Sequence, residues 1–374
     1  MKTLILAGGL GTRLRPLSCT RPKLLFPIAN RPIIDLILER LGACGVKEVV
    51  LAVNFLADVL EQTCGKSKYG MQLHYSRDKL LDSERTYSPE KALGTGGPVK
   101  QAEELLGRDA PFFVLNGDIL TDADYLEILN AHKNNNSIAT IALRRVADPS
   151  RYGTVEITKE NRIRKFVEKP IRGAPSNLIN AGVYVFEPDI FNFIPTGKRC
   201  SIEKDVFPNL ATEGLLFGHE ITDLWVDIGK PADLIEANRL WLEAHEEAAR
   251  HFVDTKVDRN VEIKSKVSIG NGVAIGCGSV IGPNVSLGKS VHVGEGVHIK
   301  DSIVFPSTYI SDLATIEGAI IGEFVRLGKK ARIRRGCLIG DNVKIKSHVS
   351  LSQNVKVCPS KIISKSVPSS ECIM

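Results

Sequence analysis

Residues 267–296 read VSIGNGVAIGCGSVIGPNVSLGKSVHVGEG, a stretch in which glycine returns at every sixth position. An aliphatic residue precedes each glycine of this ladder, which consists of Gly270, Gly276, Gly282, Gly288 and Gly294. A hexapeptide period of this kind predicts a parallel β-helix, in which each six-residue unit forms one side of a triangular coil. We expect the aliphatic residue to point into the coil and the glycine to permit the turn.

A second tract with the same period occupies residues 321–357. Its aliphatic register runs through Ile321, Leu327, Ile333, Ile339, Ile345, Leu351 and Val357. The two tracts are out of phase, so we expect residues 300–318 to hold an insertion or a distorted coil. We assign residues 256–374 to this hexapeptide-repeat domain and expect its coil to be left-handed.

The first two-thirds of the chain alternates strand-like and helix-like patterns. Short apolar runs at residues 4–7, 49–53 and 112–115 are typical of strands buried on both faces of a parallel sheet. Between them, apolar residues recur at helical spacing in residues 32–44. This pattern predicts a doubly wound, Rossmann-like α/β domain, which we place at residues 1–232.

Later segments of this domain have a different pattern. Residues 138–143, 154–157 and 164–168 are shorter and more alternating, so we expect them to add antiparallel strands beside a cleft. Residues 233–252 form an amphipathic helical pattern, and we assign residues 233–255 to a connecting helix and linker.

Length and composition narrow the remaining possibilities. A chain of 374 residues with 43% hydrophobic and 25% charged residues is expected to form two globular domains. The net charge of +6 is modest, and no basic tract interleaved with aromatic residues indicates nucleic-acid binding. The eight cysteines form no Cys-x-x-Cys pair, which argues against a zinc or redox motif. The apolar run at residues 4–7 is too short for a signal peptide or a membrane span, so we expect a cytoplasmic protein without a membrane partner.

A glycine-rich segment directly follows the first predicted strand and reads Leu6-Ala7-Gly8-Gly9-Leu10-Gly11-Thr12-Arg13-Leu14-Arg15-Pro16. Its three glycines let backbone N–H groups approach phosphate oxygens, and Arg13 adds a forked cation suited to phosphate. The segment lacks the third glycine of the dinucleotide fingerprint, and no Gly-Lys-Ser/Thr follows as in a P-loop. By itself, it could also be a glycine-rich turn of no catalytic meaning.

Three further residues favour the catalytic interpretation. Lys23 lies ten positions after Arg13 and could bring a second cation to the same site. Asp118 follows a buried strand, and the carboxyl ends of strands face the ligand crevice in doubly wound folds, so it is well placed to bind Mg²⁺. Asp227 is a second carboxylate flanked by apolar residues. Taken alone, either aspartate could equally form a turn or cap a helix.

Together these motifs resemble the sugar-nucleotide pyrophosphorylase family of nucleotidyl transferases over nearly the whole chain. Besides the glycine-rich segment, the shared motifs are Pro22-Lys23, Leu93-Gly94-Thr95-Gly96-Gly97, Asn116-Gly117-Asp118, Glu168-Lys169-Pro170, Asn180-Ala181-Gly182 and Trp225-x-Asp227-Ile228-Gly229. Within the family, residues 149–153, 201–208 and 364–374 look most like the β-type catalytic subunits of eukaryotic mannose-1-phosphate guanylyltransferases.

The resemblance implies a reaction in which a sugar-1-phosphate attacks the α-phosphorus of a nucleoside triphosphate and pyrophosphate leaves. It favours GTP with mannose-1-phosphate, and the alternative is UTP or dTTP with glucose-1-phosphate. The implied nucleotide-binding residues are Leu6, Ala7, Gly8, Gly9, Gly11, Thr12, Arg13, Lys23, Leu93, Gly94 and Asp118. The implied sugar-phosphate-binding residues are Tyr152, Gly153, Glu168, Lys169, Asn180 and Asp227. Asp118 and Asp227 would hold Mg²⁺, and they form the catalytic set with Arg13 and Lys23.

One stretch departs from the family. Residues 78–91 form a longer segment than members usually carry there, Ala92 stands where proline is common, and Gly96 replaces a frequent alanine. Because this loop would border the base pocket, the departure bears on base preference more than on reaction type.

Two other function classes stay open. Hexapeptide β-helices often carry acyltransferase sites with a histidine base, and His292, His298 and His348 are available here. A regulatory subunit that has lost its chemistry should lack one of the four catalytic residues, and all four are present. We therefore expect an active enzyme whose β-helix supports a homo-oligomer or binds a regulatory paralogue.

Overall fold

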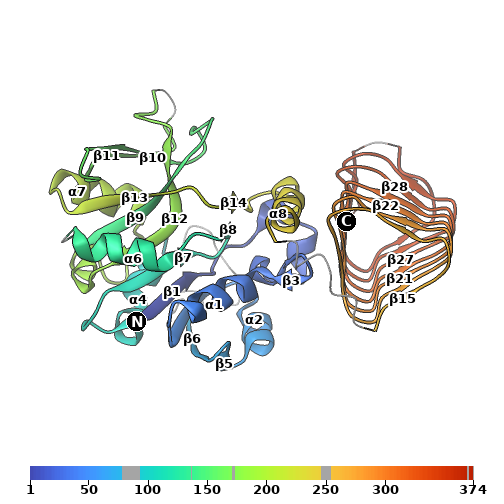
Figure 1. The fold of residues 1–374 in the computed structure, drawn as a ribbon, viewed down its shortest axis with the longest axis horizontal. Coiled ribbons are helices and arrows are strands. Elements are labelled where there is room, and N and C mark those ends of the chain that lie inside the picture. Colours follow the sequence, from blue (N-terminus) through green and yellow to red (C-terminus); the bar gives the residue numbers. More distant parts are fainter. Residues whose placement is uncertain (78–92, 136, 171–172, 246–253, 369, 374) are drawn as a thin grey trace. The chain divides into compact units, whose positions relative to one another are not determined.

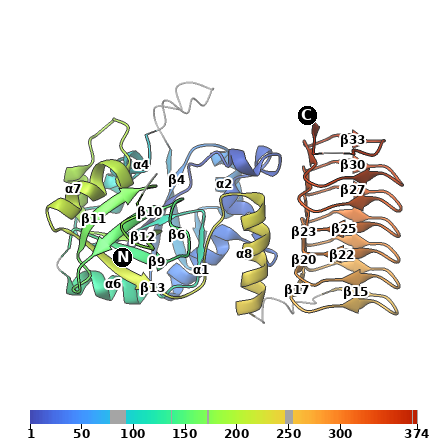
Figure 2. The same ribbon diagram turned by 90° about the horizontal axis from the view of Figure 1, so that it is seen from above.

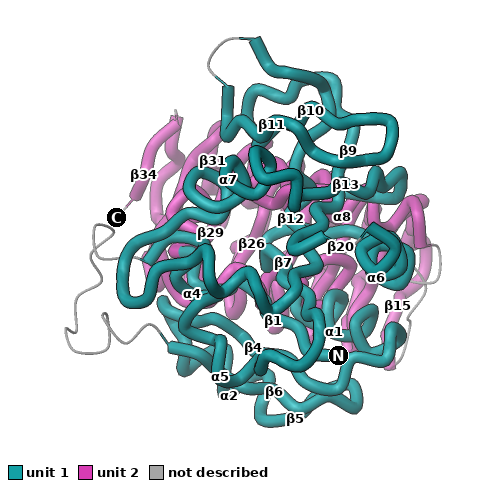
Figure 3. The backbone as a smooth tube through the Cα atoms, turned by 90° about the vertical axis from the view of Figure 1, so that its left-hand side faces the viewer, with its two compact units in different colours: residues 1–9, 34–225 teal, residues 10–33, 226–374 magenta. Residues whose placement is uncertain are grey.

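A computed structural model describes residues 1–77, 93–135, 137–170, 173–245, 254–368 and 370–373. The chain divides into two compact units, coloured separately in Figure 3. Unit 1 comprises residues 1–9 and 34–225, and unit 2 comprises residues 10–33 and 226–374. Residues 10–33 therefore belong by their contacts to the unit that contains the C-terminal repeats. No helix in the described part of the chain is long and apolar enough to cross a membrane.

A ten-stranded sheet forms the centre of unit 1 (Figure 1). Its parallel part contains, in spatial order, β7 (Phe112–Asn116), β1 (Lys2–Leu6), β4 (Glu48–Val53) and β6 (Met71–Arg77). Leu4 and Ile5 are both fully buried, and consecutive residues of a strand point to opposite faces of the sheet. Both faces of β1 are therefore covered, which confirms the doubly wound arrangement predicted from the apolar runs.

The remaining strands extend the sheet on the β7 side, and most of them are antiparallel, as expected. They are β9 (Ala139–Arg145), β10 (Gly153–Ile157), β11 (Ile163–Glu168), β12 (Leu178–Phe186) and β13 (Leu216–Ile221). β12 pairs antiparallel with β7, β9 and β10, whereas β13 pairs in parallel with β9. β5 (Ser67–Lys68) pairs antiparallel with β6 at the other edge.

Helices and short turns join these strands. The α-helices are α1 (Ile33–Ala43), α2 (Ala57–Cys64), α4 (Gly96–Gln101), α5 (Glu103–Leu106), α6 (Tyr125–Asn134) and α7 (Phe207–Thr212). Two other elements are the 3₁₀ helix η5 (Pro188–Phe193) and the π-helical turn η6 (Ile202–Val206). The strands β8 (Ile119–Thr121) and β14 (Trp225–Asp227) lie outside the main sheet, and β14 contains the boundary between the units.

Unit 2 contains a three-sided parallel β-helix whose coils stack one upon another (Figures 1 and 2). The first sheet is β15 (Lys256–Val257), β18 (Ala274–Ile275), β21 (His292–Val293), β24 (Tyr309–Ile310), β27 (Arg326–Leu327), β30 (Lys344–Ile345) and β33 (Ile362–Ile363). The second is β16 (Glu262–Ile263), β19 (Val280–Ile281), β22 (His298–Lys300), β25 (Thr315–Glu317), β28 (Arg332–Ile333) and β31 (Ser350–Leu351). The third is β17 (Val267–Ile269), β20 (Val285–Leu287), β23 (Ser302–Val304), β26 (Ile320–Ile321), β29 (Leu338–Ile339), β32 (Lys356–Val357) and β34 (Cys372–Ile373).

The aliphatic residues of the repeat fill the coil, as predicted. Ile275, Ile281 and Leu287 are at most 1% exposed and belong to one continuous apolar cluster along the β-helix axis. All pairings within the three sheets are parallel, for example Ala274 opposite His292. This geometry is consistent with the expected left-handed coil of hexapeptide repeats.

The change of phase between the two tracts has a different cause from the one expected. Val304 follows Ile299 by five positions, and Ile321 follows Ile316 by five, whereas the other residues of this register recur every six from Ile269 to Ile363. Each of these two sides has therefore lost one residue, and the coil continues through both. The change of phase comes from these two shortened sides, and parallel pairing continues through both of them. The expected insertion or distorted coil at residues 300–318 is therefore wrong.

The ladder glycines also serve a purpose other than the predicted one. Most of these glycines do not have a positive backbone angle φ. The residue two positions after the glycine has one instead, as at Gly278 (69°) and Ser290 (57°). A Cβ atom on Gly276 would instead lie 2.7 Å from a backbone carbon of Gly294 in the next coil. Glycine is therefore required mainly because successive coils approach so closely. Gly282, with a φ of 104°, is an exception in this ladder.

Helix α8 (Pro231–Ala244) and the segment at residues 10–33 complete unit 2. The predicted helix at 233–252 is confirmed up to Ala244, and His245 follows as its carboxyl-terminal cap with a non-helical backbone. Residues 246–252 of the prediction lie outside the described residues. The segment contains the 3₁₀ helices η1 (Thr12–Leu14), η2 (Leu17–Cys19) and η3 (Lys23–Leu25) and a hairpin of β2 (Pro27–Ile28) and β3 (Arg31–Pro32). Ala29 and Asn30 at the hairpin turn both have positive φ, 46° and 66°, which is typical of a type I′ turn.

Candidate active site

The glycine-rich segment begins where β1 ends, in unit 1. Ala7 donates its backbone N–H to the Ala52 carbonyl (2.9 Å), which continues the β1–β4 ladder by one residue. A Cβ atom on Gly8 would lie 3.2 Å from Nδ2 of Asn54, whereas one on Gly9 would meet no atom within 4 Å. The backbone at Gly9 is therefore open to a ligand, as a phosphate-binding loop requires.

Asp118 lies beside this loop. It follows β7, the neighbour of β1 in the sheet, and the intervening Gly117 donates its N–H to the Leu6 carbonyl (3.1 Å). The carboxyl ends of β1 and β7 thus bring Leu6, Gly8, Gly9 and Asp118 to one edge of the unit 1 sheet. This juxtaposition agrees with the position expected for Asp118, because ligands bind at such edges in doubly wound folds.

In unit 2, the second half of the glycine-rich segment approaches the Asp227 motif. Gly11 has a φ of 58°, and its carbonyl accepts a hydrogen bond from Oγ of Ser18 (2.7 Å). A Cβ atom on Gly229 would lie 3.3 Å from Nη1 of Arg13, so the guanidinium group packs against this glycine. Gly229 in turn donates its N–H to the Asp227 carbonyl (3.0 Å). The sequence predicts no role for Gly229, and its place in the Trp-x-Asp-Ile-Gly motif is the signal that could have indicated one.

Leu93 and Gly94 are fixed by a segment far away in sequence. Cys200 donates its N–H to the Leu93 carbonyl (3.0 Å), and its own carbonyl accepts the N–H of Gly96 (2.9 Å). Gly94 has a φ of 75°, and a Cβ atom there would lie 2.3 Å from the Cys200 carbonyl oxygen. No other residue would fit at Gly94 without a backbone shift. The preceding long segment 78–91 and Ala92 lie outside the described residues.

A side-chain network continues this attachment. Thr95 donates through Oγ1 to Oε2 of Glu203 (2.6 Å) and accepts the N–H of Ile202 (2.9 Å). Ser201 also donates through Oγ to Oε2 of Glu203 (2.8 Å). In the sequence, residues 201–208 carry only a resemblance to the family. Their structural role is to hold the Leu93–Gly96 turn.

Residues predicted to bind the sugar phosphate gather on β10, β11 and β12. Gly153 lies opposite Glu168 across the β10–β11 pair, and a Cβ atom on Gly153 would lie 2.8 Å from a Glu168 carboxylate oxygen. Lys169 donates its N–H to the Tyr152 carbonyl (3.1 Å), and its ammonium group lies 3.2 Å from the Glu168 carboxylate. The Tyr152 ring packs edge-to-face on Trp225, with ring centroids 5.5 Å apart.

Asn180 is held from two sides. Its Oδ1 accepts the N–H of Gly182 (2.9 Å), and its Nδ2 donates to the hydroxyl of Tyr184 (2.9 Å). Burial raises the pKa of Tyr184 well above its ordinary value. Its hydroxyl oxygen accepts the hydrogen bond from Asn180. The Asn180 amide is therefore fixed in one orientation.

The predicted site residues are divided between the two units. Unit 1 holds Leu6, Ala7, Gly8, Gly9, Leu93, Gly94, Asp118, Tyr152, Gly153, Glu168, Lys169 and Asn180. Unit 2 holds Gly11, Thr12, Arg13, Lys23 and Asp227. Within the described ranges, no group of three or more His, Cys, Asp or Glu side chains is arranged to hold a metal ion.

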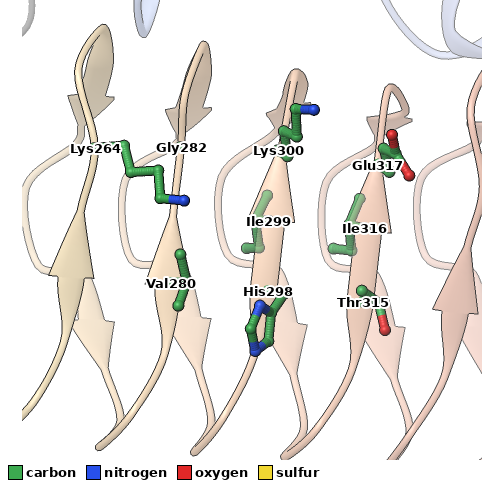
Figure 4. A pocket seen from close by; sticks show the side chains of 9 residues that line it. All are labelled: Lys264, Val280, Gly282, His298, Ile299, Lys300, Thr315, Ile316 and Glu317. Atoms are coloured by element: carbon green, nitrogen blue, oxygen red, sulfur yellow. The ribbon is translucent and has the colours of Figure 1, made fainter.

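The β-helix histidines that raised the acyltransferase alternative are dispersed. His298 lines a cavity of about 300 Å³ on the second sheet, together with Lys264, Thr315 and Glu317 (Figure 4). No described residue forms a hydrogen bond with the His298 ring. The His292 ring stacks on Tyr309 at a centroid distance of 4.3 Å. Since a histidine base is normally oriented by a hydrogen-bonding partner, this arrangement does not favour acyl transfer.

Comparison with known proteins covers almost the whole chain. Residues 2–244 match the family described as nucleotidyl transferase, and residues 263–373 match the family described as GMPPB C-terminal domain. A mannose-1-phosphate guanyltransferase from Yarrowia lipolytica is 40% identical over the full length of both chains. HddC from Yersinia pseudotuberculosis, solved in complex with GMP-PN, is 28% identical with a TM-score of 0.52, over 64% of this chain and 99% of its own. A putative glucose-1-phosphate thymidylyltransferase from Bacillus anthracis, 24% identical with a TM-score of 0.57 over 64% and 95%, shares the fold.

Proposed function

We propose, since the chain belongs to the nucleotidyl transferase family, that it transfers GMP from GTP to mannose-1-phosphate, giving GDP-mannose and pyrophosphate. The observation that carries the proposal is the backbone at Gly9, which is open to a ligand. Asp118 is held beside this loop, because the preceding Gly117 donates its N–H to the Leu6 carbonyl. The choice of base and sugar draws on the name of the Yarrowia lipolytica relative and on GMP-PN bound to HddC.

The proposed chemistry requires no covalent intermediate. A phosphate oxygen of mannose-1-phosphate attacks the α-phosphorus of GTP in line, and the bond to pyrophosphate breaks. A phosphate monoester is already nucleophilic near neutral pH, so catalysis depends on positioning and on neutralising charge. In this proposal Arg13 stabilises the departing pyrophosphate, and Lys23 contacts the phosphates of both substrates.

Other residues would orient the two substrates. Leu93 and Gly94 would lie along the base, on the turn that Cys200 holds. Lys169 would neutralise the sugar phosphate, and Glu168 would accept hydrogen bonds from sugar hydroxyls. The 3.2 Å separation between Lys169 and Glu168 supports their action on one small ligand.

Asp118 and Asp227 would hold Mg²⁺ in this proposal. Mg²⁺ prefers oxygen ligands and commonly takes one or two protein carboxylates, with waters and substrate phosphates completing its shell. Two aspartates suit that chemistry. When bound, the ion would neutralise charge on the reacting phosphates.

We therefore expect Asp118→Ala or Asp227→Ala to lower kcat by about 1,000-fold, because the lost charge stabilisation is worth roughly 4 kcal/mol. Circular dichroism should show an intact fold in both variants. The exposed Asp109 supplies the control, and Asp109→Ala should keep its rate within twofold. Near-normal turnover of either test variant at saturating Mg²⁺ would contradict the metal assignment.

A pyrophosphate-release assay tests the substrates directly. We expect the highest kcat/KM with GTP and mannose-1-phosphate, compared across four nucleotides and several sugar phosphates. A preference for UTP or dTTP with glucose-1-phosphate would support the alternative instead.

We also propose that residues 1–232 supply the chemistry, that residues 233–255 connect the domains, and that residues 256–374 mediate association with another copy or a regulatory paralogue. Light scattering would report that association.

A further inference from the structure

The third sheet of the β-helix contacts the segment that carries Lys23, and all the residues involved belong to unit 2. On the amino-terminal side of Lys23, Arg21 forms an ion pair with Glu323 (2.7 Å) and lies 3.4 Å from an Asp341 oxygen. The Arg21 guanidinium also lies 4.9 Å from the ring centroid of Phe305. Three coils of the β-helix therefore hold one side chain that stands two positions before Lys23.

Asp341 is the most enclosed charged member of this cluster, with a side chain only 8% exposed. Its Oδ2 accepts a hydrogen bond from Oγ1 of Thr20 (2.7 Å), and its Oδ1 accepts the backbone N–H of Glu323 (2.7 Å). A Cβ atom on Gly322 would lie 2.5 Å from this carboxylate, so the absence of a side chain at Gly322 leaves space for it. Asp341 is thus fixed by the β-helix backbone on one side and binds the Lys23 segment on the other.

The carboxyl-terminal side of Lys23 is held as well. Phe26, fully buried, packs edge-to-face on Phe305, with ring centroids 6.0 Å apart. Farther along, Asn30 donates through Nδ2 to Oγ of Ser268 on β17 (2.9 Å). Between these anchors, Lys23 begins the short 3₁₀ helix η3, in which Leu24 is buried. The backbone at Lys23 is therefore constrained on both sides by one face of the β-helix.

We propose that the third sheet of the β-helix positions Lys23 for nucleotidyl transfer, with Arg21, held by Glu323 and Asp341, as the positioning residue. The proposal rests on the proposed function of Lys23, because it concerns how that side chain reaches the substrate phosphates. A displacement of about 1 Å at a reacting group can reduce a rate by roughly 100-fold. The β-helix would then contribute to the rate of the reaction, besides any part it has in association.

A kinetic double-mutant cycle on the full chain tests this proposal. The variants are Arg21→Met, Lys23→Met and the double variant, each measured for kcat and for both KM values. We expect Arg21→Met to lower kcat by about 10- to 100-fold. If Arg21 acts through Lys23, the double variant should be no more than threefold slower than Lys23→Met, since the two losses are not independent.

Asp341→Asn provides a second cycle with Lys23→Met, in case Arg21→Met does not fold. The amide keeps an oxygen for the Glu323 N–H but loses the charge that faces Arg21, and the same non-additivity is expected. The control is Arg335→Met, since Arg335 is 63% exposed and its ion pairs with Asp301 (3.6 Å) and Glu317 (3.7 Å) lie elsewhere on the β-helix. Its kcat should stay within twofold of the unaltered chain.

Three results would overturn the proposal, and they are distinguishable. An unchanged kcat in Arg21→Met, with only a lower melting temperature, would leave Arg21 a purely structural role. Losses that multiply in the double variant would show that Arg21 does not act through Lys23. A normal rate in Lys23→Met would instead refute the proposed function of Lys23 itself, on which the positioning depends.

Discussion

Replacing Asn238 by alanine tests how helix α8 is joined to the turn at Ala29 and to the β-helix. Asn238 is 1% exposed. Its Oδ1 accepts two hydrogen bonds, from the backbone N–H of Ala29 (2.9 Å) and from Oγ of Ser286 on β20 (2.8 Å). The variant would remove the shared acceptor and leave two buried donors without a partner.

The magnitude follows from those two donors. A buried donor left unsatisfied costs about 1–3 kcal/mol, so two cost roughly 2–6 kcal/mol. The deleted side chain leaves space for about one water, which could bond to both donors and recover part of the loss. We therefore expect Asn238→Ala to lower local stability by about 2–3 kcal/mol. Ala29, whose φ of 46° is unfavourable for a residue with a side chain, should be the first to open.

Hydrogen–deuterium exchange measures this locally, because an amide exchanges when its hydrogen bond opens. A loss of about 2 kcal/mol corresponds to roughly 30-fold faster exchange at the Ala29 amide. Ser286→Ala is the matched control. It removes the Ser286 hydroxyl, so no buried donor is left without an acceptor, and it keeps the hydrogen bond from the Ala29 N–H to Asn238. It should cost about 1 kcal/mol and change Ala29 exchange by less than about threefold. Equal exchange at Ala29 in both variants would refute the shared-acceptor reasoning.

Three further perturbations test other parts of the structure. Gly94→Ala should raise the KM for GTP at least tenfold and leave the KM for mannose-1-phosphate within twofold, because the new Cβ would lie 2.3 Å from the Cys200 carbonyl oxygen; equal changes in both KM values would argue against a role near the base. Burial lowers the pKa of His132 more than the Glu187 carboxylate raises it. As the pH falls from the unfolded-state pKa of about 6.5 towards the lower folded-state pKa, His132 therefore binds more protons in the unfolded chain than in the folded one. The free energy of unfolding should therefore fall with falling pH in this range, by at most about 1.4 kcal/mol per pH unit. Urea titrations at several pH values measure this dependence, and the free energy of unfolding of His132→Gln should change less with pH. Gly328→Ala should destabilise the β-helix by about 1–3 kcal/mol in thermal unfolding, because its Cβ would lie 2.4 Å from the Ser347 nitrogen; an unchanged melting temperature would show that the coils can separate.

Some features of the site follow from local sequence, and others do not. The turn at Gly117 could be placed beside the glycine-rich segment, because both follow strands of one parallel sheet. The packing of Arg13 on Gly229 and the attachment of Gly94 to Cys200 could not, since no local pattern links those positions. The interior of the β-helix was predictable, yet the reason for its glycines required the distance between successive coils.

The amino-acid sequence by itself determined the hexapeptide coil and the alternating α/β domain. Both are encoded in periods of a few residues that specify which side chains are buried. Only the tertiary structure decided that Arg21 meets Asp341, 320 positions later, and that residues 10–33 belong with the β-helix. The physical reason is that these contacts form when secondary-structure elements pack against one another. Such packing produces no periodic pattern in the sequence of either segment.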